Sequence, residues 1–273
     1  MLFRDLLKTT VPSRLILALG TFLAGIIALG NNDIKSIAIA AASIALADLA
    51  SSSLNSVYDV EIDKINRQNR PKTAKKDKSI LAFILSLATL SLITATLANY
   101  YLVAIVLARL LFEYIYSVLR IKKMFIINHI SVGVTYCILP LLAASSISEN
   151  TLIPIFAYFF VLSVFMTPLK DIDDVAGDKK HNVRTLPVVI GIRKARYVIF
   201  TGSILLTLLA LLSDADLLLW PSIASITILI ILFILSLIAK DNKKQESMLT
   251  KISMTSAILI EIIFALAVGG MIV

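Results

Sequence analysis

Long apolar runs separated by short polar segments dominate the chain. Nine such runs have helical length, and they cover residues 15–30, 36–58, 79–98, 100–119, 125–145, 152–169, 197–213, 218–238 and 251–272. Each is close to the ~20 residues that an α-helix needs to cross the hydrocarbon core of a bilayer. The pattern therefore predicts an all-α polytopic membrane protein with nine transmembrane helices.

The third and fourth runs are separated only by Asn99 and Tyr100, so hydropathy fits one kinked helix as well as two helices. The distribution of Lys and Arg residues decides between one helix and two. With nine spans, all but two of the 26 Lys and Arg residues fall on one side of the membrane, the exceptions being Lys35 and Arg109. Fusing the two runs destroys this segregation. The positive-inside rule then predicts a cytoplasmic N-terminus.

Composition supports the same class of protein. Hydrophobic residues make up 58% of the chain and the mean hydropathy is +0.91, more than a soluble domain can bury. The net charge of +8 reports topology, because no basic soluble domain is present to bind nucleic acid. The single cysteine, Cys137, excludes a disulfide framework and is expected to be a buried, inert thiol. We expect one transmembrane domain over residues 1–273.

Two polar connections, residues 59–80 and 170–196, are rich in both carboxylates and bases. Each contains an Asp-x-x-x-Asp pair that is followed by a basic, Pro-containing stretch. The pairs are Asp59 with Asp63 and Asp174 with Asp178. This likeness indicates a weak internal repeat of two related helical halves.

Helical spacing gathers these acids on single faces. Asn55, Asp59 and Asp63 follow at i, i+4 and i+8. The second connection shares a face through Asp171, Asp174 and Asp178. Crowded carboxylates repel one another unless a hard cation such as Mg²⁺ joins them. The alternative is acids that only solvate helix ends, but two matching motifs favour a metal-bridged diphosphate site facing the cytoplasm.

Other polar residues lie deeper in the apolar runs. Asp48 shares the face of Asn55, and it either lines a polar cavity or is hydrogen-bonded to Ser or Asn across a helix contact. Arg109 and Glu113, four residues apart, are expected to neutralise each other. His129 and His181 are too far from any Cys/His cluster to predict zinc, and His181 is expected to be solvated.

A basic cluster follows the fourth run. Arg120 and Lys123 either clamp phosphate oxygens or serve only the positive-inside distribution, and both interpretations stay open.

These motifs resemble those of the UbiA superfamily of intramembrane prenyltransferases. Three stretches carry the resemblance: NSVYDVEID from Asn55 to Asp63 is similar to NDxxDxxxD, DIDDVAGD from Asp171 to Asp178 to DxxDxxxD, and YSVLR from Tyr116 to Arg120 to YSxxLK. Departures are Ser56 where the family often has Asp, and Arg120 where it has Lys. The resemblance extends over essentially the whole chain.

The resemblance implies a horseshoe of helices around a central cavity, with both Asp-rich loops on its cytoplasmic side. It implies two Mg²⁺ ions held by Asn55, Asp59, Asp63, Asp171, Asp174 and Asp178. A prenyl diphosphate donor would ionise there to an allylic carbocation. Asp59 and Asp174 would be catalytic, and the ring of Tyr116 would shield the cation. Four bases would assist the leaving group: Arg67, Arg120, Lys123 and Lys170.

The acceptor is suggested by residues 177–188, GDKKHNVRTLPV, which look most like the archaeal lipid-forming members of the family. These join the geranylgeranyl group of geranylgeranyl diphosphate to geranylgeranylglyceryl phosphate by an ether bond. An aromatic acceptor of the 4-hydroxybenzoate or naphthoate type is the alternative. Among other classes, an ion-coupled secondary transporter should carry its acids at the bilayer centre. A CDP-alcohol phosphotransferase should carry a DGxxAR-type motif, which is absent.

Overall fold

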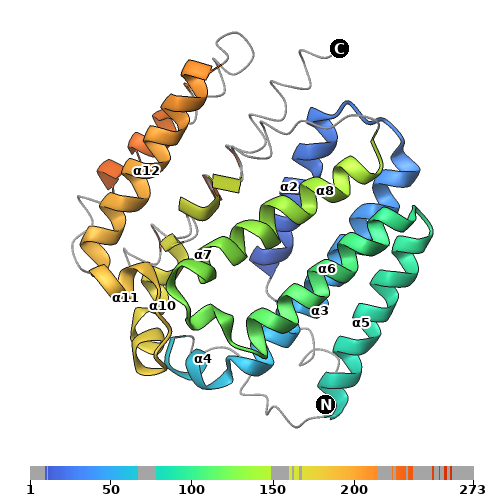
Figure 1. The fold of residues 1–273 in the computed structure, drawn as a ribbon, viewed down its shortest axis with the longest axis horizontal. Helices are drawn as coiled ribbons and strands as arrows, with labels where there is room; N and C mark the ends of the chain where they lie inside the picture. The colour runs from blue at the N-terminus through green and yellow to red at the C-terminus, as the bar shows by residue number, and fades with distance from the viewer. Residues whose placement is uncertain are drawn as a thin grey trace.

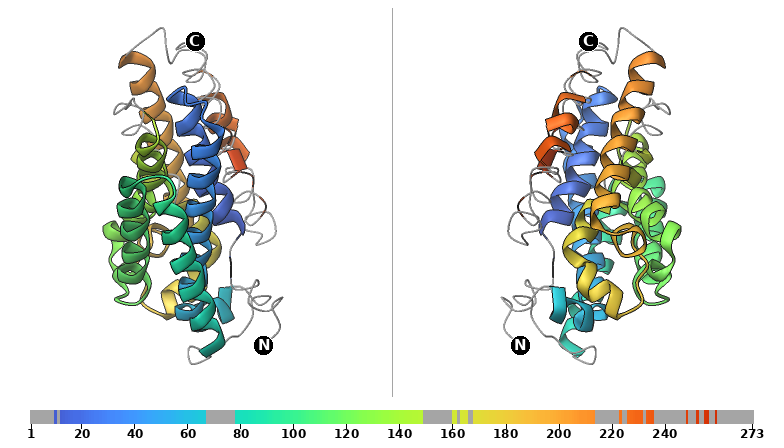
Figure 2. Two further views of the ribbon diagram at one scale, coloured as in Figure 1. Left: turned by 90° about the vertical axis from the view of Figure 1, so that its right-hand side faces the viewer. Right: turned by 90° about the vertical axis from the view of Figure 1, so that its left-hand side faces the viewer.

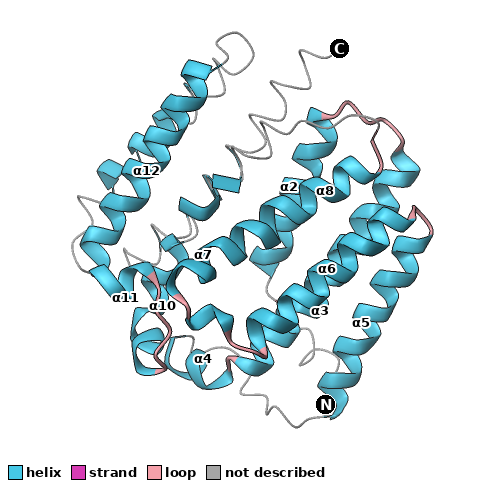
Figure 3. Cartoon of the chain, in the orientation of Figure 1, coloured by secondary structure: helices cyan, strands magenta, loops and turns pink. Residues whose placement is uncertain are grey.

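The chain is almost entirely helical in the part that the structure, a computed structural model, describes. This part comprises residues 10, 12–66, 78–148, 160–161, 163–165, 168–213, 223, 226–231, 233–235, 248, 252, 255–256 and 259. It contains no strand (Figure 3). The predicted all-α class is confirmed.

The first four apolar runs form separate helices close to their predicted bounds. These are α2 (Pro12–Ala28), α3 (Ile34–Tyr58), α5 (Lys78–Thr96) and α6 (Tyr100–Ser117). The break between α5 and α6 is fixed by Asn99, whose Oδ1 accepts a hydrogen bond from the backbone N–H of Leu102 at 2.8 Å. Such a side-chain cap starts a new helix. The prediction of two helices in place of one kinked helix is confirmed.

The fifth run is one long, irregular helix. It consists of α7 (Phe125–Gly133), the π-helical turn η2 (Val134–Ile138) and α8 (Leu139–Ser146). Pro140 has no backbone N–H to donate to the carbonyl one turn earlier. That missing bond explains why the helix widens into a π turn here.

Short helices gather at one end of the molecule. They are α4 (Val60–Asn66), η1 (Ile121–Lys123), α10 (Pro168–Lys180) and α11 (Leu186–Ile190), after which α12 (Ile192–Ser213) returns along the bundle. Figure 1 shows α4, α10 and α11 together at the lower left, and the side views of Figure 2 show these segments toward the lower end of the molecule. The described parts of both polar connections therefore lie at one end of the bundle.

Two apolar clusters hold the long helices together. One lies between α2, α3, α6 and α8 around fully buried Phe22 and Leu102, and the other joins α8, α10 and α12 around Leu141 and Phe200. Close approach of α2 to α8 depends on Gly25, because a Cβ there would lie 2.8 Å from Ala144 Cβ. Small residues permit such packing between membrane helices.

The outer faces of the helices are apolar as well. Large hydrophobic side chains are exposed along α5 and α6, including Leu81, Leu85, Leu107 and Leu111. Of the described helices, α3, α5, α6 and Phe125–Ser146 are long and apolar enough to cross a membrane. The chain is thus a helical membrane protein. Three predicted spans, at 152–169, 218–238 and 251–272, lie largely outside the described residues, so the total of nine and the orientation stay predictions.

Candidate metal and diphosphate site

The first Asp motif lies where α3 passes into α4. The backbone N–H of Asp59 donates to the carbonyl of Asn55 at 2.9 Å, and that of Asp63 donates to the carbonyl of Asp59 at 2.7 Å. Helical hydrogen bonding therefore continues through the junction although α3 ends at Tyr58. Asn55, Asp59 and Asp63 follow one another at one-turn intervals, as their spacing predicts.

The second Asp motif lies on α10, which packs directly against α4 (Figure 1). The backbone N–H of Gly177 donates to Asn66 Oδ1 at 2.7 Å. A Cβ at Gly177 would lie 2.6 Å from the Asn66 amide, so any larger residue there would displace the Asn66 side chain. The structure thus brings together the two helices that carry the predicted motifs, although the motifs lie more than a hundred residues apart in the sequence.

Several of the predicted ligands are buried at this end of the bundle. Asn55, Asp171 and Asp178 are buried, whereas Asp63 and Asp174 are half-buried. Oxygen donors of this kind suit Mg²⁺. Within the described part of the chain, no group of three or more His, Cys, Asp and Glu side chains is already gathered for a metal. The donor chemistry fits the ion, and shared coordination by both motifs stays a prediction.

The second motif has contacts of its own. Thr185 Oγ1 donates to Asp178 Oδ2 at 3.4 Å. Nδ1 of the buried His129 lies 3.9 Å from Asp171 Oδ2. His129 thus lies beside a predicted ligand and is not part of a zinc cluster in the described residues, whereas His181 is half-buried just beyond α10.

The basic residue that contacts the first motif is Lys122, whereas the sequence singled out Arg120 and Lys123. Lys122 is buried, and its Nζ donates to Asp59 Oδ1. The turn depends on Arg120, which adopts a left-handed backbone conformation with φ +58°. Arg120 and Lys123 on either side are only half-buried. The sequence pattern does not distinguish Lys122 from its neighbours, because the three bases are equivalent until the turn orients them.

Tyr116 lies beside this lysine. Its hydroxyl donates to Asn128 Oδ1 at 2.7 Å, and Lys122 Nζ lies 5.9 Å from the centre of its ring. The backbone of Lys170 lies in α10 just before Asp171. Arg67 lies outside the described residues.

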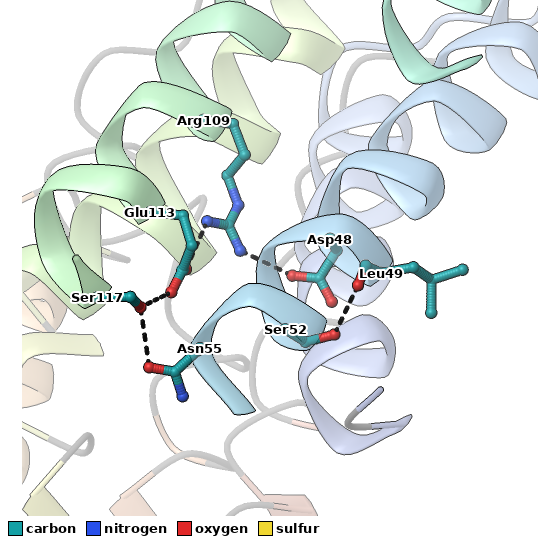
Figure 4. Close-up of polar contacts among 7 residues, drawn as sticks. All are labelled: Asp48, Leu49, Ser52, Asn55, Arg109, Glu113 and Ser117. Atoms are coloured by element: carbon teal, nitrogen blue, oxygen red, sulfur yellow. Dashed lines mark hydrogen bonds and ion pairs between the residues drawn. The ribbon is translucent and has the colours of Figure 1, made fainter. Parts of the chain in front are cut away.

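Deeper in the bundle, buried charges join α3 to α6 (Figure 4). Arg109 Nη2 lies 2.9 Å from Asp48 Oδ1, and its Nη1 lies 3.2 Å from Glu113 Oε2. The predicted Arg109–Glu113 pair is confirmed. The partner found for Asp48 is an arginine, so a Ser or Asn partner, one of the two alternatives, is wrong in type, and the other alternative, a polar cavity, stays a prediction. The ring of Tyr136 covers the guanidinium, 5.4 Å from Arg109 Cζ.

The chain is similar in sequence to a known family and to two named relatives. The model of the UbiA prenyltransferase family matches residues 17–257. The digeranylgeranylglyceryl phosphate synthase of Thermococcus kodakarensis is 30% identical over 203 residues, 72% of each chain. The enzyme of that name from Saccharolobus solfataricus is 30% identical over 220 residues, 77% of each chain.

Solved structures share the fold. A UbiA homologue from Archaeoglobus fulgidus bound to DMAPP and Mg²⁺ superposes with a TM-score of 0.72 at 18% identity, covering 94% of this chain and 98% of that chain.

Proposed function

The chain belongs to the UbiA prenyltransferase family, and from this premise we propose that it transfers a geranylgeranyl group from geranylgeranyl diphosphate to geranylgeranylglyceryl phosphate. That it is a membrane prenyltransferase follows from the family itself. The lipid acceptor is supported by the relatives named digeranylgeranylglyceryl phosphate synthase.

One observation carries the proposed site: α10 is clamped onto α4 through Gly177 and Asn66, at the end of the bundle where Lys122 contacts Asp59. Two Asp-rich segments and a buried cation suit a metal-bound diphosphate. The proposed ligands of two Mg²⁺ ions are Asn55, Asp59, Asp63, Asp171, Asp174 and Asp178. Held by these residues, Mg²⁺ would supply positive charge to neutralise the oxygens of the leaving diphosphate.

The side chains of the protein have separate proposed tasks. The allylic C–O bond of the donor breaks and its electron pair leaves with the diphosphate. Lys122, with Arg67, Arg120, Lys123 and Lys170, stabilises that charge. Tyr116, held by Asn128, presents its ring to the carbocation, an attraction of about 0.5–2 kcal/mol. The acceptor hydroxyl oxygen then bonds to the cationic carbon and releases its proton.

The membrane setting serves this chemistry. A prenyl chain gains about 0.8 kcal/mol for each CH₂ transferred from water to an apolar environment. The apolar outer faces of α5 and α6 keep the protein in the lipid where such donors reside. A site that excludes water also protects an allylic cation from hydrolysis. We propose that the diphosphate end faces the cytoplasm, in line with the charge distribution of the sequence.

The acceptor is tested by a direct comparison. Purified full-length chain is incubated with labelled geranylgeranyl diphosphate and Mg²⁺, with either geranylgeranylglyceryl phosphate or 4-hydroxybenzoate. We expect labelled digeranylgeranylglyceryl phosphate from the first and no labelled product from the second. Product from the aromatic acid alone would overturn the lipid acceptor and leave the prenyltransferase assignment in place.

A further inference from the structure

A continuous chain of polar contacts runs from the bundle interior to the first Asp motif (Figure 4). It starts at Asp48 on α3, passes through Arg109, Glu113 and Ser117 on α6, and returns to Asn55 on α3. Each of these five residues is at most 6% exposed. A fully connected buried network fixes the orientation of its members. Its last member is the first residue of the proposed metal site.

Chemistry fixes the direction of the hydrogen bonds along this chain. Arginine can only donate, and Arg109 donates to Glu113 Oε2 at 3.2 Å. The other carboxylate oxygen, Oε1, lies 2.6 Å from Ser117 Oγ. Both oxygens of the Glu113 side chain accept, Oε2 from Arg109 and Oε1 from Ser117. Ser117 therefore gives its only hydroxyl proton to Glu113.

This assignment leaves Asn55 with one possible role toward Ser117. In the structure the amide atom of Asn55 at 3.0 Å from Ser117 Oγ is Oδ1. Two acceptors cannot bond each other, and the serine proton is already used. The amide nitrogen and oxygen are nearly the same in shape, so the surrounding hydrogen bonds decide their order. Nδ2 of Asn55 must face Ser117 and donate to it.

We propose that Asp48, Arg109, Glu113 and Ser117 orient the Asn55 amide so that Oδ1 turns away from Ser117 as a ligand for Mg²⁺. The terminal atom away from Ser117 is the one drawn as nitrogen in Figure 4, and rotation of the amide puts oxygen there. This inference rests on the proposed function, since it supplies a ligand of the same site. Glu113 and Ser117 are then positioning residues.

The electrostatics of the network favour this direction. Arg109 contacts both Asp48 and Glu113, and Arg14 at the start of α2 lies within electrostatic range of the same two carboxylates. Two basic and two acidic side chains therefore balance in formal charge. Glu113 is held as an acceptor, so a reversed amide, which would turn its N–H groups toward the cation, is disfavoured. Partners of metal ligands commonly change metal affinity by about 10–100-fold.

The substitution Glu113→Gln reverses the chain of hydrogen bonds. Its amide oxygen accepts from Arg109, so its nitrogen donates to Ser117, which then donates to Asn55 Oδ1 and turns the Asn55 N–H groups toward the metal. We expect the full-length variant to bind Mn²⁺ at least about tenfold more weakly in the presence of inorganic pyrophosphate. Electron paramagnetic resonance of free Mn²⁺ measures this without any turnover.

A second substitution separates orientation from general damage. Asn55→Asp presents oxygen in both orientations, so the effect of Glu113→Gln on Mn²⁺ binding should vanish in that background. Ser117→Ala should weaken Mn²⁺ binding, whereas Ser117→Thr, which keeps the hydroxyl, should bind Mn²⁺ like wild type. This pair tests the inference even if the Glu113 variant does not fold. The control is Ser43→Ala, which removes a buried hydroxyl that donates to the Ser91 carbonyl at 2.8 Å, away from the site. It should leave Mn²⁺ affinity unchanged.

The possible outcomes are distinct. Unchanged Mn²⁺ affinity in Glu113→Gln, or an equal loss in the Asn55 and Asn55→Asp backgrounds, overturns the inference and leaves the proposed function standing. A wild-type chain that binds Mn²⁺ but transfers no prenyl group overturns the proposed function. In that case the Mn²⁺ affinity of Glu113→Gln relative to wild type still tests the inference. A wild-type chain that binds no Mn²⁺ contradicts both.

Discussion

At the residue scale, Lys122 is the buried cation that contacts Asp59, and this contact predicts how its replacement changes kcat. Lys122→Ala should lower kcat by about 10²-fold, the usual loss when one preorganised donor to developing negative charge is removed. Lys123→Ala should lower kcat by a smaller factor, because the Lys123 side chain is only half-buried. The exposed Lys179→Ala on α10 is the control and should keep wild-type kcat. Equal losses in the Lys122 and Lys179 variants would contradict this role.

Residue chemistry was predictable where it follows from spacing along one helix. Arg109 and Glu113 lie four residues apart and do pair. The partner of Asp48 comes from another helix, and no spacing in the sequence predicts which helices touch. Lys122 was missed because the direction of its side chain depends on the backbone of Arg120. Local pairs are encoded locally, whereas partners across helices depend on packing.

At the element scale, the clamp between α4 and α10 should be needed for the site. Gly177→Ala would place a Cβ 2.6 Å from the Asn66 amide, displace that amide and break its hydrogen bond to the residue 177 backbone N–H. We expect Mg²⁺-dependent prenyl transfer to fall at least about tenfold, since small displacements of positioned groups cost this much or more. The assay is initial rate against Mg²⁺ concentration.

Two further variants control this prediction. Asn66→Ala removes the clashing amide, so Gly177→Ala combined with it should be less impaired than Gly177→Ala with Asn66 present. Gly30→Ala changes a glycine at φ +65° with nothing within 4 Å, and should cost stability without altering the dependence on Mg²⁺. A Gly177→Ala chain as active as wild type would show that the close contact is not required.

The start of α3 carries a pH-dependent cap. Asp33 Oδ2 accepts a hydrogen bond from Ser36 Oγ at 2.5 Å, and its Oδ1 accepts one from the Lys35 backbone N–H at 3.1 Å. The hydrogen bond from Ser36 lowers the pKa of the Asp33 carboxyl. Since the folded-state pKa is depressed, the stabilisation is present above the unfolded value of about 3.9 and disappears as pH falls through the folded one.

Thermal unfolding of wild type and Asp33→Ala as a function of pH measures this. Wild type should have the higher Tm at neutral pH, and the difference should shrink below about pH 4. Asp33→Asn keeps a capping oxygen but does not titrate, so its Tm difference from Asp33→Ala should vary less with pH. A wild-type advantage that grows on acidification would contradict the cap.

The bounds of α2, α3, α5 and α6 were predictable because each run of apolar residues has one helix length, and the break at Asn99 carries its own capping signal. Two irregularities were not predicted. The junction at Asp59 keeps helical hydrogen bonds, and the π turn before Pro140 interrupts a uniformly apolar run. Hydropathy predicts neither the junction nor the π turn, because neither feature changes the polarity of the residues involved.

At the scale of the whole molecule, charge segregation and paired motifs predicted that both Asp-rich segments would share one end, and the packing of α10 on α4 agrees. What holds them there, a backbone N–H of Gly177 on Asn66, has no sequence signal beyond a glycine in a motif. The family and its fold follow from the motifs themselves. The acceptor depends on the lining of the site, which the apolar pattern does not encode.

The most direct test of the central claim is release of inorganic diphosphate from geranylgeranyl diphosphate in the presence of the acceptor, by purified full-length chain. Release should require Mg²⁺, stop on chelation, and fall at least about a hundredfold in both Asp59→Asn and Asp174→Asn. Asp173→Asn, an exposed acid beside Asp174 on the same helix, should release diphosphate at the wild-type rate. Release that persists without divalent cation, or that survives either motif substitution, would contradict a single site built from both Asp motifs.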